Sequence, residues 1–274
     1  MAPKDDVAVS HFVLTRFNIA SEGREVAIRN SPGWLERRFD LFKTYCLPSM
    51  AAQTCQNFRW LIYFDHGTPR GIRERIAQAQ KIFPFEAVFV GPFDMKMTAH
   101  DVASRLSPEA ARIITTRLDN DDAVSIDFIE KIQTYGMSCA SGTVLNFTHG
   151  IALRNRLAYS ACDASNPFTS LVSCAADVRV IWEATHRSLA ETFDLQQVSD
   201  GPVWLQVVHG ENVANRIKGR LLPISTIAES FVIDKGTFVE PSRGQILLDR
   251  TVFWPIRYTR EMLIGLIKAV AVRK

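Results

Sequence analysis

The stretch Thr115-Thr116-Arg117-Leu118-Asp119-Asn120-Asp121-Asp122 follows the apolar pair Ile113-Ile114 and ends in a group of carboxylates. This pattern is typical of a buried strand that reaches the edge of a sheet and delivers charge there. Side chains alternate between faces in an extended chain, so Asp119 and Asp121 are expected on one side. Two converging carboxylates repel each other unless a cation lies between them, and oxygen ligands suit Mg²⁺ or Mn²⁺. The stretch therefore predicts a divalent-metal site.

A simpler interpretation is a helix cap. Asp122 or Ser125 could cap a helix over Ile126–Thr134, and the helix dipole would favour the other acids nearby. The Asp-x-Asp pattern alone is compatible with both a helix cap and a metal site.

The first half of the chain alternates between strand and helix patterns. We expect strands at 7–17, 58–65 and 86–90, and helices at 34–47, 70–82 and 126–137, with Pro48 ending the first helix. Such alternation is typical of an open α/β sheet, in which ligands bind beyond the carboxyl ends of the strands. Three predicted strands end in suitable polar residues, namely Thr15 and Arg16, Asp65, and the pair Asp119 and Asp121.

The second half contains short strand-like segments with turns between them, which favour antiparallel pairing. These segments are 142–147, 150–154, 157–161, 168–174 and 195–199. A further strand over 203–208 leads to His209, and Gly210 follows it. The region 220–258 gives no clear assignment. A basic amphipathic helix is predicted at 258–273, either packed on its own domain or in contact with an anionic membrane face.

Bulk properties narrow the class of protein. The chain has 274 residues, 47% hydrophobic and 22% charged, with a net charge of +3, which gives no argument for nucleic acid binding. It has neither a membrane-length apolar run nor an apolar secretion signal at its start. Its five cysteines show no Cys-x-x-Cys spacing and favour reduced thiols in a cytoplasmic protein. They are Cys46, Cys55, Cys139, Cys162 and Cys174.

Several runs of residues together resemble one bacterial family. The runs are His11-Phe12-Val13-Leu14-Thr15-Arg16-Phe17-Asn18, Leu47-Pro48-Ser49, Gln53-Thr54, Trp60 to Asp65, Thr116 to Asp122, and Trp204 to Asn212. They are similar to the rhamnosyltransferase family, which resembles glycosyltransferases of the GT-A fold, over roughly residues 10–215. The resemblance implies a GT-A-like (Rossmann-like) mixed central sheet flanked by helices, with a smaller antiparallel β-rich acceptor half and a C-terminal helix.

The resemblance also implies an arrangement of functional regions. Residues 1–274 would form a single domain with a nucleotide-sugar-binding half (1–137), an acceptor-binding half (138–219) and a C-terminal extension (220–274). By similarity, Asp65 would lie near the base or ribose and Asp119 near the ribose or metal. Asp121 would hold Mn²⁺ or Mg²⁺ against the diphosphate, and His209 would return to the metal.

Chemistry suggests further roles. A divalent cation can stabilise the negative charge that builds on the leaving diphosphate, and Arg16 or Arg117 could add positive charge. Both arginines could equally be structural partners of the acids. An inverting transfer needs a base near the acceptor hydroxyl, and Asp200 is the first candidate, with Asp177 and His149 in reserve. Asp200 could instead be an ordinary turn residue in its Asp-Gly-Pro run.

His11 is expected to be a hydrogen-bonded core residue, and Trp204 either stacks on a sugar or belongs to the core. The leading function is a metal-dependent glycosyltransferase, with a nucleotide-diphosphate sugar donor and a glycan or lipid-linked acceptor in surface polysaccharide synthesis. The alternatives are a metal-dependent phosphoesterase and a non-catalytic nucleotide- or sugar-binding protein of the same fold.

Overall fold

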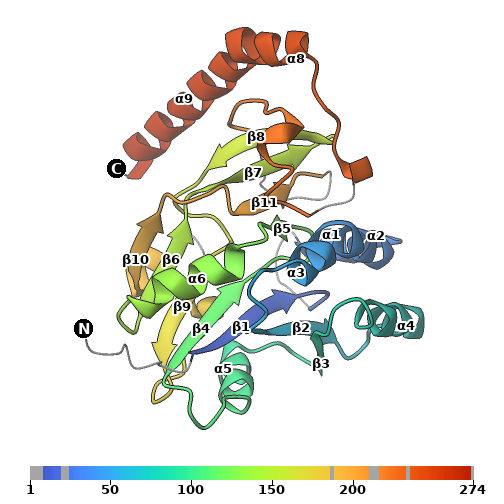
Figure 1. Cartoon of the computed structure of the whole chain (residues 1–274), viewed down its shortest axis with the longest axis vertical. Coiled ribbons are helices and arrows are strands. Elements are labelled where there is room, and N and C mark those ends of the chain that lie inside the picture. The colour runs from blue at the N-terminus through green and yellow to red at the C-terminus, as the bar shows by residue number, and fades with distance from the viewer. Residues whose placement is uncertain (1–8, 20–24, 186–187, 210–215, 233–234, 273–274) are drawn as a thin grey trace.

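The main sheet has seven strands in the order β10-β6-β9-β4-β1-β2-β3 in this computed structural model, which describes residues 9–19, 25–185, 188–209, 216–232 and 235–272 (Figure 1). The strands are β1 (Val9–Arg16), β2 (Arg59–Asp65), β3 (Glu86–Val90), β4 (Arg112–Arg117), β6 (Thr143–Phe147), β9 (Ser170–Cys174) and β10 (Asp194–Val198). All pair in parallel except β9, which is antiparallel to both neighbours, β4 and β6. The carboxyl ends of the other strands therefore meet at one edge of the sheet.

A second sheet has the order β5-β11-β7-β8 and contains β5 (Ala123–Val124), β7 (His149–Arg154), β8 (Leu157–Cys162) and β11 (Trp204–Val207). The chain enters it directly from carboxyl ends of main-sheet strands, because β4 leads to β5, β6 to β7 and β10 to β11. Only Thr148 separates β6 from β7. The second sheet consequently lies over the carboxyl edge of the main sheet (Figure 1).

This architecture confirms the expected mixed central sheet flanked by helices, but the strand pairing differs in detail. β6, β9 and β10 extend the main sheet, although they were expected in a separate antiparallel half. β10 pairs in parallel with β6, and β11 pairs in parallel with β7. The β7–β8 hairpin is antiparallel and turns at Asn155 and Arg156, which both have positive φ, as tight hairpin turns require.

The helices flank the main sheet and form the C-terminal end of the described chain. They are α1 (Glu25–Arg29), α2 (Trp34–Leu41), α3 (Leu47–Ala51), α4 (Arg70–Ala79), α5 (Met95–Ala103), α6 (Phe128–Met137), α7 (Leu189–Thr192), α8 (Arg243–Leu248) and α9 (Trp254–Val272). Shorter or wider turns are η1 (Phe42–Cys46), η2 (Ile181–Glu183), η3 (Ile224–Thr226), η4 (Lys235–Thr237) and η5 (Asp249–Phe253). Among the described helices, none is both long and apolar enough to cross a bilayer.

The expectation that Pro48 ends the first long helix is wrong. The chain stays helical from Trp34 to Ala51, because a π-helical turn, η1, links α2 to α3 and Pro48 falls in the first turn of α3. Proline lacks a backbone N–H, and a first-turn position needs no intrahelical donor.

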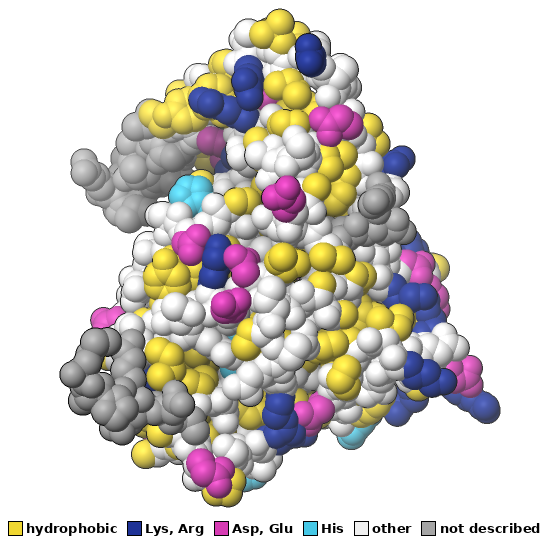
Figure 2. Space-filling model, in the orientation of Figure 1, with side chains coloured by type: hydrophobic (Ala, Val, Ile, Leu, Met, Phe, Trp, Pro, Cys, Tyr) yellow, Lys and Arg dark blue, Asp and Glu magenta, His cyan; other side chains and the backbone are white. Residues whose placement is uncertain are grey.

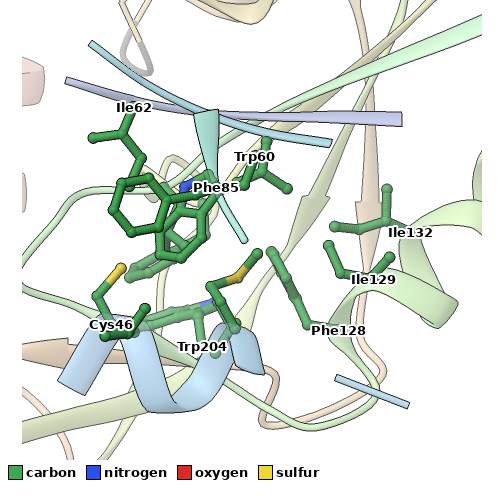
Figure 3. Close-up of a cluster of buried hydrophobic side chains, with 14 of the residues drawn as sticks. Cys46, Trp60, Ile62, Phe85, Phe128, Ile129, Ile132 and Trp204 are labelled. Carbon is green, nitrogen blue, oxygen red and sulfur yellow. The ribbon is translucent and has the colours of Figure 1, made fainter. Parts of the chain in front are cut away.

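The largest hydrophobic cluster joins the two sheets. It includes Ile62 and Trp60 of β2, Cys46 of η1 and Trp204 of β11 (Figure 3). Trp204 is buried and stacks on Phe168 with ring centroids 5.2 Å apart. Trp204 is therefore a core residue rather than a sugar platform. All five cysteines are free thiols, as expected, although the Cys162 side chain is exposed.

Candidate functional site

Loops that follow β1, β2 and β4 are joined at the carboxyl edge by two asparagines. Asn18, after β1, accepts a hydrogen bond from the backbone N–H of Asp65 at 3.1 Å. Asn120, after β4, donates from Nδ2 to the carbonyl oxygens of Arg16 and Phe17 at 2.9 and 3.0 Å. Side-chain amides thus satisfy backbone groups that no strand can pair here, and they fix the relative positions of the three strand ends.

Asp121 is the most constrained acid at this edge, with only 6% of the residue exposed. Its Oδ2 accepts a hydrogen bond from His209 Nε2 at 2.9 Å and forms an ion pair with Arg38 Nη1. Burial disfavours the charged carboxylate, but the His209 hydrogen bond and the Arg38 charge outweigh it and lower the pKa of Asp121. Asp121 therefore carries its negative charge at neutral pH.

Asp122 explains how His209 reaches this position. Its Oδ1 accepts a hydrogen bond from the backbone N–H of Val207 at 2.8 Å, at the end of β11 and two residues before His209. Burial, and then the charges of Asp121 and Asp119, raise the pKa of Asp122 well above its ordinary value. This carboxyl group is therefore a structural tie between the acidic loop and β11.

The helix-cap interpretation of the acidic stretch does not hold. The residue that precedes α6 is Asp127, and Ser125 donates from Oγ to Asp127 Oδ1 at 2.6 Å. Asp122 is engaged with β11 instead. The helix begins at Phe128, two residues later than expected, because residues 126–127 form a turn in which the backbone N–H of Ile126 donates to the carbonyl oxygen of Ser230 at 2.9 Å.

Arg38 is a site residue that sequence reasoning missed. It comes from α2, and its guanidinium carbon lies 5.3 Å from the centroid of the Trp34 ring, which supports it from one side. A signal was present, since Arg38 is the one charged residue in an otherwise apolar series at helical spacing in 34–47. A charge on the buried face of a helix usually has a partner of opposite sign.

Asp119 is also paired with an arginine. Arg117 Nη2 lies 3.0 Å from Asp119 Oδ2, and the Asp119 side chain is 36% exposed. The two acids that were expected to share a cation therefore each face a guanidinium. In the described part of the chain, no group of three His, Cys, Asp or Glu side chains could hold a metal ion.

Two potential ligand atoms for a divalent ion lie close together at this edge of the sheet. Asp121 and His209 offer an oxygen and a nitrogen within 2.9 Å of each other. Mg²⁺ typically uses one or two carboxylates and completes its shell with water and substrate phosphates. The pair fits an ion that is shared with a phosphate-bearing ligand, and it does not form a self-contained metal centre.

Thr15 and Asp65 end neighbouring strands but face different surroundings. Thr15 is fully buried, and its Oγ1 accepts a hydrogen bond from Trp60 Nε1 at 2.9 Å. Asp65 Oδ1 accepts a hydrogen bond from the backbone N–H of Gly67 at 2.6 Å, which closes the turn after β2. Thr15 therefore lies beneath the edge, whereas Asp65 lies on it.

Arg16 is exposed at the end of β1 and lies against two aromatic rings. Its guanidinium carbon is 5.6 Å from the Trp182 ring centroid and 5.9 Å from that of Phe93. The aromatic faces hold the guanidinium at the edge of the sheet. Arg16 thus places positive charge on the same side of the sheet as Asp65.

Asp200 follows β10, three strands away from β4 in the main sheet. Its Oδ1 accepts a hydrogen bond from Lys131 Nζ at 2.9 Å, and Asp127 pairs with the same lysine at 3.1 Å. Among the reserve bases, His149 is exposed at the start of β7. Asp177 follows the antiparallel strand β9 and so lies at the opposite edge of the sheet from Asp121, which argues against it.

Several solved structures are similar to this chain. S. aureus TarS (residues 1–349) in complex with UDP matches with a TM-score of 0.47 and 11% identity, over 73% of this chain and 60% of that chain. Another crystal structure of the same TarS fragment matches with a TM-score of 0.46 and 10% identity, over 72% of this chain and 60% of that chain. A "putative nucleotide-diphospho-sugar transferase" from Desulfovibrio desulfuricans G20 matches with a TM-score of 0.38 and 8% identity, over 72% of this chain and 80% of that chain. The chain thus spans 60% of the TarS fragment.

Sequence comparison gives the decisive result. No curated protein sequence matches the chain. The model of the family described as "Putative rhamnosyl transferase" matches residues 10–221, which is well over half of the 274 residues. The chain therefore belongs to this rhamnosyl transferase family of glycosyltransferases.

Proposed function

We propose that the protein transfers a sugar from a nucleoside diphosphate to a hydroxyl of a glycan or lipid-linked acceptor, in surface polysaccharide synthesis. The observation that carries the proposal is the group of Arg38, Asp121 and His209 at the carboxyl edge of a sheet. Membership of a family described as rhamnosyl transferase supports it and makes rhamnose the first sugar to test.

Positive charge is the chemical requirement of this reaction. Cleavage of the bond between the sugar and the phosphate leaves negative charge on the diphosphate, and guanidinium groups match phosphate oxygens with paired hydrogen bonds. Arg16, Arg38 and Arg117 supply such groups around the site. A divalent ion held by Asp121 and His209 would add Lewis-acid stabilisation of the same charge.

The acceptor hydroxyl must lose its proton, and Asp200 is the proposed base. Its side chain is 43% exposed, so an acceptor can approach it. Asp127 provides a matched control, since it also pairs with Lys131 and is exposed to a similar extent. Asp200→Asn should lower kcat by about a hundredfold or more with little change in donor binding. Asp127→Asn should leave kcat nearly unchanged, and equal losses in both variants would exclude Asp200 as the base.

The decisive experiment measures thermal shifts with a panel of nucleoside diphosphates, with and without Mn²⁺. A nucleotide that binds the folded state raises Tm, and a shared ion makes that shift depend on Mn²⁺. Asp121→Asn should abolish the Mn²⁺-dependent part. A shift that is equally large without Mn²⁺ and in the variant would contradict the proposed ion.

Turnover assays then separate the other functions. Nucleotide-sugar donors of the preferred base, starting with a rhamnosyl donor, should release nucleoside diphosphate when an acceptor is present. Hydrolysis of a simple phosphoester without nucleotide preference would favour a phosphoesterase. Nucleotide binding without turnover across donors and acceptors would favour a non-catalytic binding protein.

A further inference from the structure

A basic cavity of about 310 Å³ lies between the β7–β8 hairpin and α9, away from the acidic loop. Its lining contains four arginines and no acid: Arg154, Asn155, Leu157, Tyr159, Arg216, Ile217, Arg257 and Arg260. Such a lining attracts an anion.

The four arginines differ in how far their charge is neutralised. Arg257 donates to Asp249 Oδ1 at 2.6 Å and to the carbonyl oxygen of Gly219 at 2.9 Å, so its charge is compensated inside the protein. The exposed Arg260 pairs with the half-buried Glu261 at 3.0 Å. Among the described residues, no carboxylate forms an ion pair with Arg154 or Arg216. The cavity therefore carries uncompensated positive charge that an external phosphate could neutralise.

The helices beside this cavity expose an unusual amount of apolar surface. Nine of the fifteen large hydrophobic side chains that are exposed among the described residues lie between Leu247 and Ile267, on α8, η5 and α9. Ile256 is 62% exposed and Ile267 is 68% exposed. Figure 2 shows hydrophobic and basic side chains side by side over this end of the molecule. Exposed apolar patches of this kind mark interaction surfaces.

The same segment is strongly basic. Residues 243–274 contain seven Lys or Arg and two acids, in a chain whose net charge is only +3. An exposed apolar face combined with arginines is the pattern of helices that lie in the surface of an anionic bilayer. A protein partner would not need the adjoining arginine-lined cavity, whereas a phospholipid headgroup supplies the phosphate that fits it.

We propose that α8, η5 and α9 dock on an anionic phospholipid bilayer and that the adjacent cavity binds a lipid phosphate. The apolar side chains enter the region below the headgroups, and Arg154 and Arg216 neutralise headgroup phosphates. This docking does not depend on sugar transfer, so it can be tested without any activity measurement.

The test is co-sedimentation of the full chain with vesicles. Vesicles of phosphatidylcholine mixed with phosphatidylglycerol should bind the protein, pure phosphatidylcholine vesicles should bind it much more weakly, and added salt should release it. Arg154→Gln and Arg216→Gln should each weaken binding by about fivefold. Arg70→Gln is the control, because Arg70 is an exposed, ion-paired arginine on α4.

The apolar face has its own matched pair of variants. Ile256→Asp should weaken binding to the anionic vesicles by about tenfold or more. Ile82→Asp should not, although Ile82 is 61% exposed, because it lies outside the proposed surface. Circular dichroism verifies that both variants are folded. Equal binding to neutral and anionic vesicles, or equal effects of the two substitutions, would overturn the proposal. A dimer that Ile256→Asp dissociates would do the same, since a second copy would then cover the face.

Discussion

Arg38 and a divalent ion would compete for the same carboxylate oxygen of Asp121. Arg38→Gln should lower the free energy of unfolding by about 3 kcal/mol, because a buried carboxylate loses its main counter-charge. In the presence of a nucleoside diphosphate, the variant should also gain a larger Tm shift from Mn²⁺ than the wild type, since the ion then meets no guanidinium. Thermal unfolding with and without Mn²⁺ measures both effects.

The control for this prediction is Arg70→Gln. The Arg70–Glu74 ion pair is exposed on α4 and should contribute less than about 1 kcal/mol. If Arg38→Gln responds to Mn²⁺ no more than the wild type, the ion does not use the position that the guanidinium occupies.

His11 makes stability depend on pH. It is buried, its Nε2 lies 2.8 Å from Thr116 Oγ1, and burial lowers its pKa to about 3 from the ordinary value of 6.5. The unfolded chain therefore binds a proton between these values that the folded protein does not, so stability falls as pH drops below 6.5. The expected contribution is up to about 1.4 kcal/mol per pH unit.

Urea unfolding at several pH values measures this dependence. His11→Gln keeps a polar side chain but does not titrate, so its stability should fall less steeply between pH 6.5 and 4 than that of the wild type, by roughly the slope of one group. Identical slopes in the two proteins would show that His11 does not control this range.

Local sequence patterns locate some residues of the candidate site but not their partners. Asp121 and His209 were predicted from strand ends, because a strand end has a recognisable sequence and a known location in an α/β sheet. The Arg38–Asp121 ion pair joins residues 83 positions apart in sequence. No local pattern specifies which helix covers which strand end, so this pairing could not be predicted.

At the scale of elements, local sequence patterns predicted which segments form helices or strands better than they predicted which strands pair with each other. The bounds expected for β3 agree with the structure, and β2, α4 and α6 differ from expectation by a few residues. The placement of β9 between β4 and β6 depends on long-range contacts, and its short apolar pair Leu171-Val172 is compatible with several neighbours.

The close packing of β7 against β11 makes Gly150 a sensitive position. A Cβ at Gly150 would collide with the indole ring of Trp204, which is buried and stacked on Phe168. Gly150→Ala should therefore lower the free energy of unfolding by about 3 kcal/mol, because the second sheet cannot expand without breaking that core. Denaturant unfolding followed by tryptophan fluorescence measures the loss.

Gly71 is the opposite case among the helices. A Cβ at Gly71 on α4 meets no atom within 4 Å. Gly71→Ala should raise stability by about 0.5 kcal/mol, because alanine loses less backbone entropy in a helix. A destabilised Gly71→Ala, or a neutral Gly150→Ala, would contradict this account of the two glycines.

At the scale of the whole molecule, the sheets share both chain and core. Three main-sheet strands continue into the second sheet, and the largest hydrophobic cluster contains Val13 and Ile62 from one sheet and Val203 and Trp204 from beside or within the other. The nucleotide-binding and acceptor-binding halves expected from the sequence therefore share one hydrophobic core. This favours one cooperative unit over two independent domains.

Native-state hydrogen exchange tests whether the two sheets unfold as one cooperative unit. The amides of Ile62 in β2 and Ile151 in β7 lie in different sheets and both are buried. If the halves unfold together, both amides exchange only through global opening, with the same free energy as denaturant unfolding. Gly150→Ala, which introduces its clash between β7 and β11 of the second sheet, should then lower the opening free energies of both amides equally. A drop at Ile151 with Ile62 unchanged would mean that the second sheet opens alone, and the single-domain prediction for residues 1–274 would be wrong.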